Sequence, residues 1–93
     1  MATYETTALN LVKARLNRLD SALDDYLMQR IRAAYDYLTN QGLHLDTDVS
    51  RDLMLVVDTA VYQYSNRDSD KGVPEWLRAQ IRQRWLMERG DQA

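Results

Sequence analysis

Apolar side chains recur at steps of three and four residues along almost the whole chain, which is the spacing of amphipathic helices. The sequence holds three glycines and one proline in 93 residues, so it has little of the turn chemistry that a β-sheet needs. This pattern predicts an all-α fold, a small bundle of about four helices with a polar loop before the C-terminal helix. Because domains usually run to about 100 to 150 residues, we expect residues 1–93 to form a single helical domain.

Four apolar stripes, each bounded by polar residues, mark the expected helices. The third contains the run LMLVV (residues 53–57), which is apolar on nearly all sides and therefore predicts a helix at the centre of the domain. Such a valine-rich run also suits a β-strand, but the stripe continues to Tyr64, which is longer than most strands. Gly42 suits the left-handed position that ends the second helix, and Asp20 or Ser21 suits its cap. The predicted helices cover residues 6–17, 22–40, 49–65 and 74–89.

No grouping of side chains has the spacing of a catalytic or metal site. Asp46, Asp48 and Asp52 could form a carboxylate cluster, but Asp48 or Ser50 is better explained as the cap of the third helix. His44 is the only histidine, and we interpret it as a partly exposed loop residue rather than a metal ligand or general base. Serine–histidine–aspartate groupings, glycine-rich phosphate loops and zinc-ligand spacings are absent from the sequence. We therefore predict no enzyme activity, no cofactor and no metal.

The loop before the last helix places oxygen-bearing side chains at alternate positions, as a calcium-binding loop does. These positions, with the glycine that follows them, are Asn66, Asp68, Asp70 and Gly72. Lys71 stands where a calcium loop requires glycine, and Leu77 stands where it requires the closing glutamate. We therefore interpret this segment as a solvated turn.

The last helix is predicted to begin at Pro74, whose missing N–H has no partner in a first turn anyway. Leu77, Ile81 and Trp85 follow at four-residue steps, and we expect all three to pack inward. Each such side chain stabilises the fold by roughly 1.5 to 3 kcal/mol when fully buried. The helix must therefore dock somewhere, on its own domain or on a partner.

The opposite side of the last helix carries arginines at steps of four and seven residues. Such a face suits the carboxylates of a protein partner or phosphate groups, or it keeps the helix solvated. Tyr62, Tyr64 and Trp76 lie around the preceding loop, either as core and rim packing or as part of a contact surface. The residues predicted as a partner interface are Arg67, Asp68, Asp70, Lys71, Arg78, Arg82 and Arg89.

Whole-chain properties limit the class of partner. The net charge is −2, which gives no reason to expect a nucleic acid or an anionic membrane. No window approaches the roughly 18 apolar residues of a membrane span. The chain has no cysteine, which is consistent with a reducing compartment. We therefore expect a soluble, intracellular protein.

The segment DLMLVVDTAVYQYSNRDSDKGVPEWLRAQIRQRW (residues 52–85) resembles the small head-tail connector, or adaptor, proteins of tailed bacteriophages and prophages. The segment LDDYLMQRIRAAYDYLTNQG (residues 23–42) resembles the preceding helix of that family. The resemblance implies a subunit of a homo-oligomeric ring that docks on the portal protein and continues the DNA channel towards a stopper or tail-completion protein. It also implies a place at the head-tail interface of the virion, reached from the host cytoplasm during assembly, with DNA passing through the channel without sequence-specific binding.

The competing hypothesis is a small helical DNA-binding regulator. In that case Arg78, Arg82 and Arg84 would contact phosphates, and binding to duplex DNA would weaken as salt rises. Glu75 and Glu88 dilute the positive field of this helix, and the pI of about 5.2 is lower than is typical of nucleic-acid readers.

Overall fold

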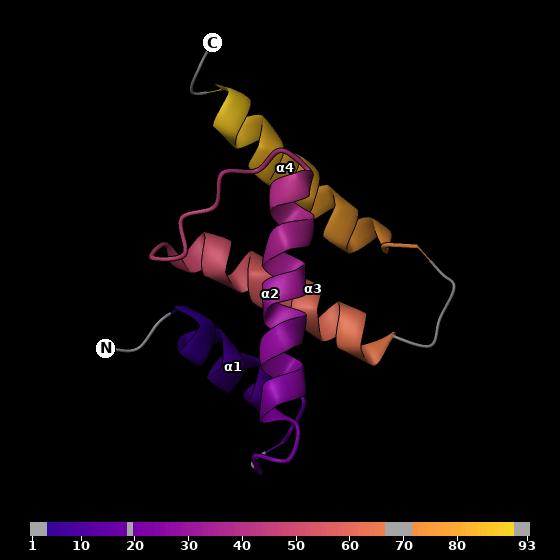
Figure 1. Cartoon of the computed structure of the whole chain (residues 1–93). Coiled ribbons are helices and arrows are strands. Elements are labelled where there is room, and N and C mark those ends of the chain that lie inside the picture. The colour runs from indigo at the N-terminus through magenta and orange to yellow at the C-terminus, as the bar shows by residue number, and fades with distance from the viewer. Residues whose placement is uncertain (1–3, 19, 67–71, 91–93) are drawn as a thin grey trace.

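The computed structural model describes residues 4–18, 20–66 and 72–90, and it shows four helices and no strand in these ranges (Figure 1). The predicted all-α bundle is confirmed. All four helices begin and end within two residues of their predicted bounds. The largest difference is at the first helix, which begins and ends two residues earlier than predicted. The helices are α1 Tyr4–Arg15, α2 Asp24–Asn40, α3 Ser50–Ser65 and α4 Glu75–Gly90.

Two residues with positive φ end the first two helices. Asn17 has a φ of 60°, a left-handed conformation that asparagine tolerates better than most residues. Gly42 has a φ of 93°, and its N–H donates to the carbonyl of Thr39 at 3.0 Å. The left-handed conformation predicted for Gly42 is therefore present, and it ends α2 where the sequence predicts.

No side chain caps the start of α2 or α3, so the predicted caps are wrong. Leu23 and Val49 occupy the N-cap positions, and neither has a side-chain oxygen that could accept a bond. At α2 the main chain supplies a bond instead, because the N–H of Asp24 donates to the carbonyl of Ser21 at 3.2 Å. The residues wrongly predicted as caps are Asp20, Ser21, Asp48 and Ser50.

The core forms around α3, which contacts the other three helices, while α2 crosses in front of it (Figure 1). The central position predicted for this helix is confirmed. Its inward stripe meets apolar side chains from α1 and α2, and residue Leu43 of the following connection closes one edge of the core. The apolar residues with no exposed surface are Ala8, Ile31, Ala34, Leu38, Val56, Val57 and Ala60.

Helix α4 lies at the edge of the bundle and packs mainly against α3. Of its residues, only Leu77 is fully buried. The domain as a whole is flat, with extents of 46 × 38 × 18 Å. Within the described ranges, no helix is both long enough and apolar enough to cross a bilayer. Because Leu77 is the only fully buried residue of α4, most of the surface of this helix has no partner among the described residues of its own subunit.

Candidate interaction surface on helix α4

The inward side of α4 is apolar in its first half and polar in its second. Leu77 is buried, Ile81 is half-buried, and the side chains of Arg84 and Glu88 are only 10% and 11% exposed. Trp85 is 37% exposed and its indole lies beside Gly42 at the end of α2, outside the core, so the prediction that it packs inward holds only in part. Trp85 comes eight residues after Leu77, and at about 100° per residue its side chain points about 80° away from the direction of Leu77. Arg84 comes seven residues after Leu77, so its side chain points within about 20° of that direction. Arg84, rather than Trp85, therefore occupies the inward position.

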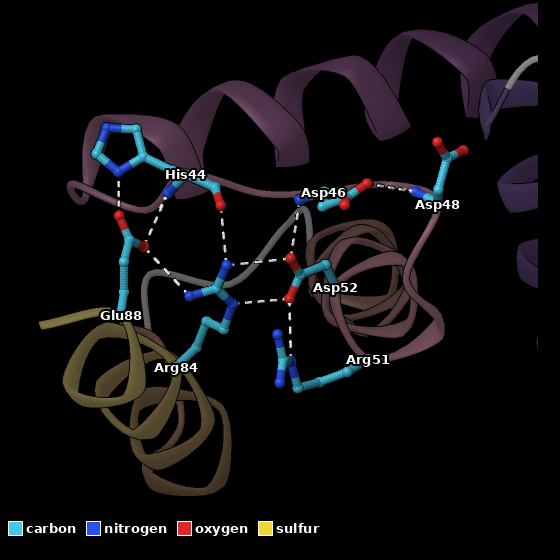
Figure 2. A network of polar contacts seen from close by, with 7 residues as sticks. All are labelled: His44, Asp46, Asp48, Arg51, Asp52, Arg84 and Glu88. Carbon is cyan, nitrogen blue, oxygen red and sulfur yellow. Dashed lines mark hydrogen bonds and ion pairs between the residues drawn. The ribbon is translucent and has the colours of Figure 1, made fainter. Parts of the chain in front are cut away.

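A buried ion pair joins α4 to α3 (Figure 2). The Asp52 carboxylate has no exposed surface, and Arg84 donates to it twice, from Nε to Oδ1 at 2.7 Å and from Nη2 to Oδ2 at 3.1 Å. The Asp46 N–H adds a third bond at 2.8 Å and the Arg51 Nε a fourth at 3.3 Å. Burial raises the pKa of Asp52, but the bonds from Arg84 and Asp46 outweigh it, so the pKa lies below its ordinary value. The pair is thus charged and fully bonded.

Glu88 extends this network to the connection between α2 and α3 (Figure 2). Its Oε2 accepts bonds from the His44 N–H at 3.0 Å and from Arg84 Nη1 at 3.2 Å, and its Oε1 contacts the His44 ring. Arg84 Nη2 also donates to the carbonyl of His44 at 2.8 Å. The bonds from the His44 N–H and ring lower the pKa of Glu88 to about 2, and the bond to Asp52 raises the pKa of Arg84. These contacts fix the orientation of α4.

The network is structural in its chemistry. Its carboxylates and guanidinium groups neutralise one another, and Arg51 and Arg84 line a small pocket of about 130 Å³ between α3 and α4. Among the described residues, no three histidine, cysteine or carboxylate side chains are placed to hold a metal ion. The His44 side chain is 81% exposed, as expected for a loop histidine, and its ring serves as a partner for Glu88.

Four large apolar side chains of α4 are exposed at different positions around the helix, and we call this set the outward face. Trp76 is 49% exposed, Trp85 37%, Leu86 54% and Met87 48%. Single exposed apolar side chains are ordinary on a protein surface, but four large ones on one helix of 16 residues are not. The outward face is therefore the candidate interaction surface of this domain.

A groove runs beside this face, between the end of α2 and α4, and has a volume of about 580 Å³. Tyr37, Ile81 and Trp85 contribute its apolar surface, and Arg78 and Arg82 contribute its charge; we call this set the arginine groove. The Arg78 side chain makes no hydrogen bond or ion pair with any residue in the described ranges. Arg82 lies 3.5 Å from Glu75 in an exposed pair, which contributes little. Both guanidinium groups are thus available to a partner.

The structure brings together only part of the predicted interface. Arg89 does not line the arginine groove but lies beside it, because its guanidinium stacks over the Trp85 ring at 4.7 Å and pairs with Glu88 at 3.5 Å. Four of the predicted interface residues, and the solvated turn predicted around them, lie outside the described residues. These four are Arg67, Asp68, Asp70 and Lys71.

The aromatic residues around that loop separate into two pairs. Tyr62 meets Trp76 edge to face at 6.4 Å, and its hydroxyl donates to the carbonyl of Gly72 at 2.8 Å. Tyr64 instead lies 5.9 Å from Tyr26 on α2. Tyr62 therefore attaches the start of α4 to the end of α3, and Trp76 alone of the three predicted aromatics belongs to the outward face.

Protonation of Glu88 should weaken the domain in acid. Its pKa in the folded state is about 2, below the value of about 4.3 in an unfolded chain. Its contribution to stability is therefore fully present above about pH 4.3 and is lost as the pH falls towards 2. We expect the free energy of unfolding, measured with urea from about pH 6 to about pH 2.5, to fall less steeply in E88Q than in the unchanged protein.

The control is D25N, which removes an exposed carboxylate of α2. It should keep the acid slope of the unchanged protein. An E88Q slope as steep as that of D25N would contradict the assignment of this pH dependence to Glu88.

Comparison with known proteins gives no relative for this chain: no family model, no curated protein and no solved structure matches it.

Proposed function

We propose that this chain is a structural subunit that works in an assembly of identical copies. The outward face of α4 is the observation that carries this proposal. It exposes two tryptophans, a leucine and a methionine on a helix whose other side is fixed by a buried ion pair. Covering such a face with a neighbour would contribute roughly 25 cal/mol for each Å² of apolar surface removed from water.

The polar network supports this proposal because it fixes the helix before any partner arrives. Association is opposed by the freedom that the interface loses, and a surface that is already ordered loses less. Arg84 and Glu88 attach α4 both to α3 and to the connection at His44. The outward face is therefore presented in one orientation, as a repeated contact between identical subunits requires.

The specific assembly that we propose is the head-tail connector ring. This form rests on the sequence resemblance of residues 23–42 and 52–85, which comprise α2, α3 and the first part of α4. In this proposal the ring docks on the portal protein, passes DNA through its channel without sequence-specific binding, and meets a stopper or tail-completion protein. It acts at the head-tail interface of the virion and assembles in the host cytoplasm.

The alternative role as a DNA-binding regulator loses one of its three phosphate contacts. Arg84 is only 10% exposed and is bound to Asp52, so it is not available to a phosphate. Of the other two arginines, Arg82 is paired with Glu75 and only Arg78 is unpaired among the described residues. The geometry therefore favours assembly over duplex binding.

Light-scattering mass across a concentration series, with and without the portal protein encoded nearby, tests the proposal. We expect the mass to rise from monomer to a multiple of 10.9 kDa, or to form a stable complex with the portal. A mass that stays monomeric at every concentration and with the portal, together with salt-sensitive retention on duplex DNA, would overturn the proposal in favour of the regulator.

A further inference from the structure

The lining of the arginine groove indicates which kind of peptide segment could bind there. Arg78 offers an unpaired guanidinium at its wall, next to the apolar surface of Ile81 and Trp85. Guanidinium groups bind carboxylates with two parallel hydrogen bonds where the geometry permits. The groove therefore suits a short segment in which a carboxylate stands beside an apolar side chain.

The same chain carries such a segment ahead of α3. In residues 46–49, which we call the acidic loop, Asp46 and Asp48 are exposed and Val49 is 38% exposed. The Asp48 carboxylate neither caps α3 nor forms a hydrogen bond or ion pair with any residue that the structure describes. It is an unpaired negative charge next to an uncovered apolar side chain.

The acidic loop is also held in place before any contact. The Asp46 N–H donates to the buried carboxylate of Asp52 at 2.8 Å, and the Asp48 N–H donates to Asp46 Oδ1 at 3.0 Å (Figure 2). Arg84, which closes the other side of Asp52, lies next to Trp85 of the groove in the sequence. One network thus orients both the loop and the helix that forms the groove.

The acidic loop and the start of α4, which carries Arg78, lie at opposite ends of α3 (Figure 1). The loop precedes the first residue of α3, whereas the groove includes Gly72 and Val73, which follow its last turn in the chain. A helix of 16 residues spans about 24 Å, so the Asp48 carboxylate of a subunit does not reach Arg78 of the same subunit. Contacts between different patches of identical subunits are heterologous, and they close into a ring when the rotation permits.

We infer that neighbouring subunits join head to tail, with the acidic loop of one copy seated in the arginine groove of the next. This inference rests on the proposed function, because it names the two surfaces by which the copies would assemble. Asp48 pairs with Arg78 of the neighbouring copy, and Val49 covers part of the outward face at Trp85. Opposite charges at the two surfaces favour this pairing over groove-to-groove contact, which would bring arginines together.

Charge reversal at single positions tests the inference. R78E and D48K should each raise the protein concentration at half-assembly by at least about tenfold, because each places like charges across the contact. An equimolar mixture of the two variants should assemble again, since each groove then meets a loop of opposite charge. The chain carrying both substitutions should also assemble alone. Sedimentation velocity measures all four cases.

Two variants with similar charge changes away from the contact serve as controls. D36K reverses an exposed carboxylate on α2, and Q83E adds a negative charge to α4 outside the groove. Both should assemble like the unchanged protein. Circular-dichroism melting should confirm that R78E and D48K fold, as expected for exposed side chains that lack an intramolecular partner among the described residues.

The outcomes separate this inference from the proposed function. If the unchanged protein assembles but the mixture of R78E and D48K does not recover, the head-to-tail contact is wrong and the proposed function stands. If R78E assembles normally and instead loses retention on duplex DNA, the groove binds phosphates and the inference is overturned. If the unchanged protein never assembles, with or without the portal, both are overturned.

Discussion

Replacing Arg84 with methionine should lower the free energy of unfolding by about 3 kcal/mol, the low end of the range for breaking a buried ion pair. The Asp52 carboxylate has no exposed surface, so removing Arg84 leaves a buried negative charge that water cannot reach. Asp46 and Arg51 still donate to it at 2.8 and 3.3 Å, which limits the loss. Urea denaturation followed by circular dichroism measures the change.

The variant R32M is the matched control, because Arg32 pairs with Glu5 while remaining 52% exposed. It should change the free energy of unfolding by less than about 0.5 kcal/mol. The double variant carrying D52N and R84M should recover part of the loss, since residue 52 then carries no buried charge and its amide oxygen can still accept the Asp46 N–H. Equal stability of R84M and R32M would contradict a structural role for the pair.

Replacing Leu77 with alanine should lower the free energy of unfolding by about 2 to 5 kcal/mol, the usual range for a buried leucine. Leu77 is 1% exposed and is the one fully buried residue of α4, so this variant removes the apolar anchor of the helix. L86A makes the same change on the same helix at a residue that is 54% exposed. It should change stability by less than about 0.5 kcal/mol, and similar losses in the two variants would show that α4 is not anchored as described.

The fold could be predicted from the sequence because it depends on local patterns. The stripes of α2 and α3 repeat at helical spacing, and the all-apolar run at residues 53–57 indicated the helix that contacts the other three. Gly42 ends α2 as its lack of a Cβ predicts. Helix α1 begins two residues before its predicted start. An error of this size is usual at a helix end where no capping side chain indicates the first residue.

The pair at the centre of the site could not be predicted in the same way. Asp52 and Arg84 are 32 residues apart, and no local pattern pairs two charges at that distance. A signal was nevertheless present. Asp52 stands four residues before buried Val56, and Arg84 stands seven after Leu77, so each takes an inward position where an apolar side chain is expected. Opposite charges on two inward stripes are a reason to expect a buried ion pair rather than a helix cap.

The residues of α4 that point inward were predicted only in part, and the reason is geometric. A run of four-residue steps drifts around a helix by about 40° per step, so Leu77 and Ile81 remain inward while Trp85 does not. The tryptophan was expected in the core because of its size and spacing. Its partial exposure leaves an apolar side chain of α4 open to a neighbour.

Quenching of tryptophan fluorescence by acrylamide across a protein concentration series tests the central claim most directly. The chain contains two tryptophans, Trp76 and Trp85, and both are exposed on α4, so the signal reports on the surface of this helix. We expect strong quenching in the dilute monomer and a clear decrease in quenching at the concentrations where the mass rises. A rise in mass with unchanged quenching would show that the copies join through another surface, and would contradict the role assigned to α4.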